Sequence, residues 1–204
     1  MLTDSMAISE TKGFSATTFS KLFWVAPDVY ATGAGRANVY LAALNELAAF
    51  REKGYSALTP DEIGQFLGDR LRTLASASEA NDVRVCLLLA GPYVNEADRA
   101  ENLCTSLYIA ETASGFKAKR APGAWYVPNA GVNGIVGRMI NDEYMQTLIG
   151  CGATYMAQAM IGMHRFAASL LHVSSDDANV IAVGSEGYTT ISGRVTTLPA
   201  PWLL

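Results

Sequence analysis

Apolar residues recur at helical spacing in the first half of the chain. Within residues 37–53, Tyr40, Leu44, Leu47 and Ala48 fall on one face of a helix. Gly54 follows directly, in the position where glycine commonly ends a helix. The pattern therefore predicts an amphipathic helix over 37–53.

A second helix has the clearest start signal in the chain. Thr59 is suited to the N-cap, Pro60 to the first helical position, and Glu62 to the third, where it completes a capping box. The residues that follow place one apolar face along the helix: Ile63, Phe66, Leu67, Leu71 and Leu74. This pattern predicts a helix that ends near 75–80.

Three further segments carry weaker signals. The apolar run 82–90 is compatible with a short helix or a buried strand, which periodicity alone does not separate. Asn95 is a suitable N-cap for a helix over about 96–113, with Glu96 and Asp98 in its first turn. Residues 115–137, rich in glycine and proline, are expected to be mostly irregular.

The longest helical candidate begins at Asp142 and reaches roughly to His172. Its many glycines and alanines have small side chains, which favours close packing against a neighbouring helix. Its stretch 144–163 holds twenty residues without a formal charge, the length of a membrane span. Several of them are polar, so we expect a buried helix of a soluble assembly and no membrane association.

The two ends of the chain differ from its middle. Residues 1–18 are polar and small, and we interpret them as an N-terminal arm. Residues 176–204 contain a segment rich in Val, Ile and Thr that predicts a β-hairpin, and they end in an apolar Trp-Leu-Leu sequence. The predicted fold is mainly α: a helical-bundle core over 19–175, extended N- and C-terminal arms, and a small C-terminal hairpin.

Composition adds a reason to expect self-assembly. Only 17% of the residues are charged, below the roughly 25% that is typical of soluble domains. Interface cores are depleted in charge, so part of this surface is expected to be covered by other copies. The three cysteines lie far apart in apolar surroundings, which indicates buried reduced thiols and a reducing, cytosolic environment.

The charges are unevenly distributed. Residues 1–111 carry 9 basic and 14 acidic residues, whereas residues 112–141 carry four bases and no acid. A local excess of bases in an acidic protein favours an anionic partner, and the alternative is an ordinary solvated loop. The candidate phosphate-binding residues are Arg99, Lys117, Lys119, Arg120, Arg138 and Arg165. Trp125 and Tyr126 are the candidates for stacking on bases.

No motif establishes catalysis, a metal site or a cofactor. Residues 31–38 resemble a glycine-rich phosphate loop, but the third glycine is replaced by Asn38, and a helix-entry turn explains them better. Within the helix predicted over 142–172, no acid or cysteine lies three or four residues from His164 or His172 to complete a metal site. We therefore predict no catalytic residues, no metal ligands and no cofactor, and expect that the chain is not an enzyme.

Residues 99–125 resemble the helix-then-loop segment of flexuous filamentous plant virus coat proteins of the potexvirus type. The matching positions are Arg99, Cys104, Tyr108, Pro122 and Trp125. The family's Phe-Asp-Phe-Phe-Asp-like motif is absent after the Trp. The resemblance implies a mainly helical core, arms that link neighbours in a helical filament, and single-stranded RNA in an inner groove, within a virion or the host cytoplasm.

The resulting hypothesis is a self-assembling viral coat or nucleocapsid protein that packages single-stranded RNA and contacts its own copies through the terminal arms. Two alternatives stay open. One is an α-rich small-molecule enzyme or ligand-binding domain, for which His164 is the place to look. The other is a filament or shell protein without nucleic acid.

Overall fold

The computed structural model of the chain divides into two compact units. One consists of residues 1–21 and 122–195, the other of Leu22–Ala121 and Thr196–Leu204. The structure describes residues 2–4, 7–9, 14–16, 20–50, 58–120, 153–170, 178–184 and 187–200, with side chains for most of them. The predicted domain division stays a prediction: an N-terminal arm at 1–18, a core at 19–175 and a C-terminal arm at 176–204.

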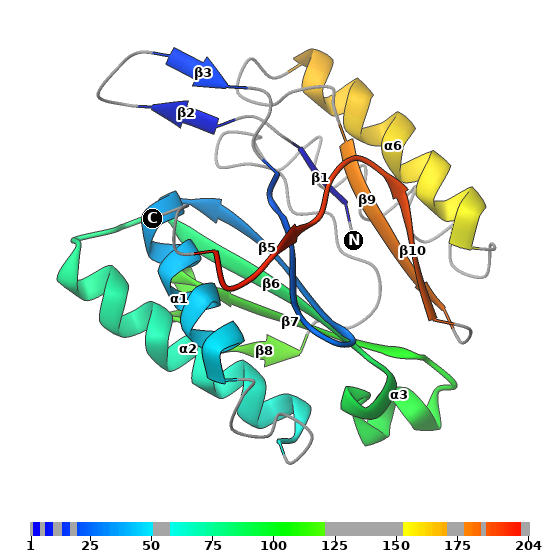
Figure 1. The fold of residues 1–204 in the computed structure, drawn as a ribbon, viewed down its shortest axis with the longest axis horizontal. Helices are drawn as coiled ribbons and strands as arrows, with labels where there is room; N and C mark the ends of the chain where they lie inside the picture. The colour runs from blue at the N-terminus through cyan, green and yellow to red at the C-terminus, as the bar shows by residue number, and fades with distance from the viewer. Residues whose placement is uncertain are drawn as a thin grey trace. The chain divides into compact units, whose positions relative to one another are not determined.

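The unit built around Leu22–Ala121 contains a six-stranded sheet with the strand order β11-β4-β5-β6-β7-β8 (Figure 1). All neighbouring pairs are antiparallel except β11 with β4, which is parallel. The strands are β4 (Leu22–Ala26), β5 (Val29–Gly35), β6 (Val83–Ala90), β7 (Thr105–Glu111), β8 (Lys119–Arg120) and β11 (Thr196–Thr197). The prediction of a mainly helical bundle is therefore wrong, and the fold is mixed α/β.

Strand β6 shows why this sheet forms. Val83, Val85, Leu87 and Leu89 are fully or almost fully buried, whereas Arg84 and the other residues that alternate with them are partly exposed. This period of two is that of a strand with one face on the core. The ambiguous run 82–90 is thus a strand, paired along its whole length with β5 on one side and β7 on the other.

Two helices cover this sheet, and the sequence predicted both. Helix α1 (Ala37–Phe50) and helix α2 (Pro60–Ala77) lie on the same face (Figure 1). The capping box at the start of α2 is confirmed, since Thr59 and Glu62 each bind the other's backbone N–H. The N–H of Thr59 is the main cause that lowers the pKa of the Glu62 carboxyl.

Two glycines in α2 allow the helix to lie very close to the sheet. A Cβ added at Gly64 would be 3.0 Å from the ring of Tyr108, and one added at Gly68 would overlap the backbone oxygen of Phe116. A side chain at Gly68 would push the helix away from the turn that follows β7, whereas a methyl group at Gly64 would need only a small shift of the Tyr108 ring. The orientation of α2 therefore depends mainly on Gly68.

The helix predicted over 96–113 is wrong beyond its first turn. Asn95 caps α3 (Glu96–Ala100) as expected, but Asn102 adopts a left-handed conformation with φ 58° and ends the helix. The chain then enters β7, where Ser106, Tyr108 and Ala110 are buried. Pairing with β6 outweighs the local helical preference of this segment.

The other unit is described by itself. It contains a three-stranded antiparallel sheet, order β1-β9-β10, built from β1 (Leu2–Asp4), β9 (Ala178–Gly184) and β10 (Gly187–Ser192). The predicted C-terminal hairpin is confirmed by the β9–β10 pair. A short pair, β2 (Ala7–Ser9) with β3 (Phe14–Ala16), is also present.

Helix α6 (Ala153–Leu170) packs against β9 and β1 of the same unit. It covers residues 153–170 of the helix predicted over about 142–172, and the other residues of that prediction lie outside the described ones. In the part of the chain that the structure describes, no helix combines the length and apolar character that a membrane crossing needs.

We predict that Gly68→Ala destabilises the protein by about 1–3 kcal/mol, because the new methyl group must displace a backbone carbonyl. Gly64→Ala is the matched control: it changes helix propensity equally, but its methyl group meets only side chains. Urea unfolding followed by circular dichroism measures both. Equal free energies of unfolding for the two variants would contradict the close approach at Gly68.

Candidate functional site

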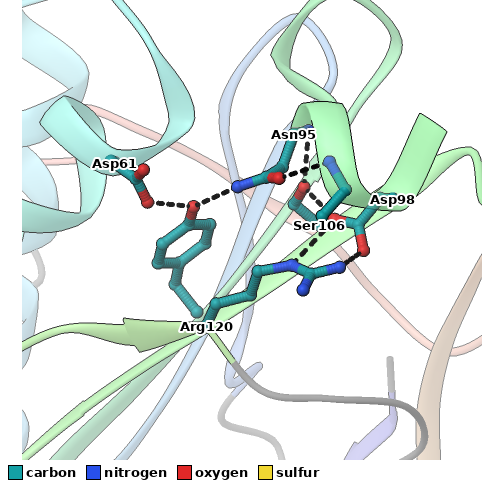
Figure 2. A network of polar contacts seen from close by, with 7 residues as sticks. Asp61, Asn95, Asp98, Ser106 and Arg120 are labelled. Carbon is teal, nitrogen blue, oxygen red and sulfur yellow. Dashed lines mark hydrogen bonds and ion pairs between the residues drawn. The ribbon is translucent and has the colours of Figure 1, made fainter. Parts of the chain in front are cut away.

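A network of polar side chains lies where β6 leads into α3 and β7. It joins Asp61 at the start of α2, Asn95 and Asp98 at α3, Ser106 and Tyr108 on β7, and Arg120 on β8 (Figure 2). The six residues come from four separate elements. The network therefore forms only when the sheet and α2 are both in place.

Asp98 is the charged centre of the network. It is 4% exposed, and its two carboxylate oxygens bind the guanidinium of Arg120, with Arg120 Nε donating over 3.2 Å to Oδ2. Ser106 Oγ donates to the same Oδ2. A buried carboxylate needs such partners, because removing an unpaired charge from water costs several kcal/mol.

Tyr108 is the second centre. Its hydroxyl donates to Asp61 Oδ1 and accepts a hydrogen bond of 3.3 Å from Asn95 Nδ2. Burial is the main cause that raises the pKa of Tyr108 to about 12, and the hydrogen bond to Asp61 adds to it, while that from Asn95 opposes it. The phenol is therefore protonated at any physiological pH and acts as a fixed donor.

Asn95 links the two centres. Its backbone N–H donates to Ser106 Oγ over 2.9 Å, and its Oδ1 accepts from the N–H of Ala97 at the start of α3. Ser106 consequently uses its hydroxyl both as acceptor and as donor, and it is 1% exposed. A serine held in this way is suited to positioning the α3 turn on the sheet and not to attacking a substrate.

Of the predicted phosphate-binding residues, Arg120 lies in the network. Arg99 lies on α3 and is exposed, with Nη2 3.4 Å from the oxygen of Pro92. Lys119 is exposed on β8, and Lys117 is exposed two residues before it. These four belong to one unit, and the ion pair with Asp98 occupies Arg120.

The remaining predicted site residues are not among the described residues of this unit. Arg165 is exposed on α6, in the other unit. Arg138, Trp125 and Tyr126 lie outside the described residues. The described residues therefore do not test whether the eight residues form one surface.

The glycine-rich residues 33–35 form the end of β5, where they pair with β6, and Arg36 leads from them directly into α1. Because β5 is antiparallel to β6, this strand and helix are not part of a βαβ unit. Gly35 has φ 83° and a Cβ there would overlap the backbone of Asp82, while a Cβ at Gly33 would be 2.5 Å from the ring of Tyr40. Chain packing accounts for both glycines without a phosphate.

Other candidates for chemistry are not assembled into a site. Within the described ranges, no group of three His, Cys, Asp or Glu residues could hold a metal ion. Burial raises the pKa of the Cys86 thiol to about 11, which keeps it protonated and weakly nucleophilic. His164 is buried on α6, and His172 lies outside the described residues.

Solved structures share this fold. No protein-family model and no curated protein matches the sequence. Two of the structural matches carry the name Anbu. Anbu (ancestral beta-subunit) from Yersinia bercovieri has a TM-score of 0.67 at 11% identity, covering 99% of this chain and 84% of that one.

A second match is the Anbu (Gly-1) mutant from Hyphomicrobium sp. strain MC1, with a TM-score of 0.68 at 9% identity and the same coverage. At these identities the likeness shows the fold alone. It nevertheless overturns the resemblance to potexvirus-type coat proteins and, with it, the hypothesis of a coat protein that packages RNA in a virion. The resembling segment 99–125 contains a strand, β7, where the coat-protein hypothesis requires a helix.

We predict an asymmetry in the Asp98–Arg120 pair. Arg120→Gln leaves a buried carboxylate without its cation and destabilises the protein by about 3 kcal/mol. Asp98→Asn costs less, about 1–2 kcal/mol, because the substituted amide still hydrogen-bonds and the Arg120 side chain, 30% exposed, reaches water. Urea unfolding of both variants tests this, and a larger loss in Asp98→Asn would contradict it.

We predict a stability loss in alkali that depends on Tyr108. Between pH 10 and about 12 the unfolded chain releases the phenol proton while the folded protein retains it. The free energy of unfolding therefore falls by up to about 1.4 kcal/mol per pH unit in this window, and the full contribution is present below pH 10. Tyr108→Phe should remove this component in urea unfolding at pH 9–12.

Tyr155→Phe is the matched control, because Tyr155 is 62% exposed on α6. A Tyr108→Phe variant with the same alkaline slope as the wild type would show that the network does not hold this proton.

Proposed function

We propose that this chain is a hydrolase-like subunit of a homo-oligomeric assembly. The observation that carries the proposal is the likeness to two Anbu structures over 99% of the chain, because their name describes an ancestral beta-subunit. A fold matched along its whole length supports a similar use as a building block more strongly than a matched fragment does.

The composition supports the same proposal. A chain with 17% charged residues has few charges to distribute over its surface, and contact with other copies would cover part of that surface. Among the described residues, two large hydrophobic side chains are clearly exposed: Leu103 and Tyr155, the latter on α6. More specifically, we propose that the copies contact one another through their terminal arms.

Hydrolysis is the second half of the proposal, and the polar network does not supply its nucleophile. Ser106 is buried and both of its hydrogen-bonding capacities are used within the chain. Two alternatives therefore remain: the sequence-based prediction that the chain is not an enzyme, and the proposal that it is a hydrolase. An activity measurement decides between the two.

We predict that the purified protein elutes as an oligomer, with a mass several times 21.7 kDa by light scattering coupled to size exclusion. A monomer at micromolar concentration would contradict assembly.

The same fractions are then assayed with a fluorescently quenched casein substrate, and turnover confined to the oligomer supports hydrolysis.

The Ser106→Ala variant is the control for this assay. We expect it to turn over substrate at the wild-type rate per folded protein, because Ser106 only positions the α3 turn. An oligomer without turnover contradicts the hydrolytic half and leaves assembly supported.

A further inference from the structure

We draw no further inference here: the strongest candidate, the exposed face of helix α6 around Tyr155 and Gly162, carries none, because nothing in the described part of the structure shows what covers it.

Discussion

The pairing of β6 with strands on both of its sides is the interaction on which the rest of the described Leu22–Ala121 unit depends. Its buried residues, such as Val85 and Leu87, form the face that α1 and α2 cover. Its pairing with β7 also decides the structure of a segment whose local sequence prefers a helix. Burying apolar surface on a paired strand outweighs a few tenths of a kcal/mol of helix propensity per residue.

The parts of the fold that depend on local signals could be predicted from the sequence. Helix α2 is the best case, because Thr59, Pro60 and Glu62 each act on backbone groups within one turn. The β9–β10 hairpin is another, since its strands are adjacent in the chain. In both cases the interactions that define the element lie within a short stretch of sequence.

The prediction failed where partners are distant in sequence. Asn95 correctly marked a helix start, but nothing near it indicated that the chain would turn at Asn102 and pair with β6. The β4–β5 pair likewise lies in a segment that was predicted as part of the helical core. Missing these strands produced the helical-bundle prediction, which agreed with the coat-protein resemblance of residues 99–125. The polar network has the same limit: the partner of Asp98 is Arg120, 22 positions away, so Arg120 was assigned to phosphate when its charge is already neutralised.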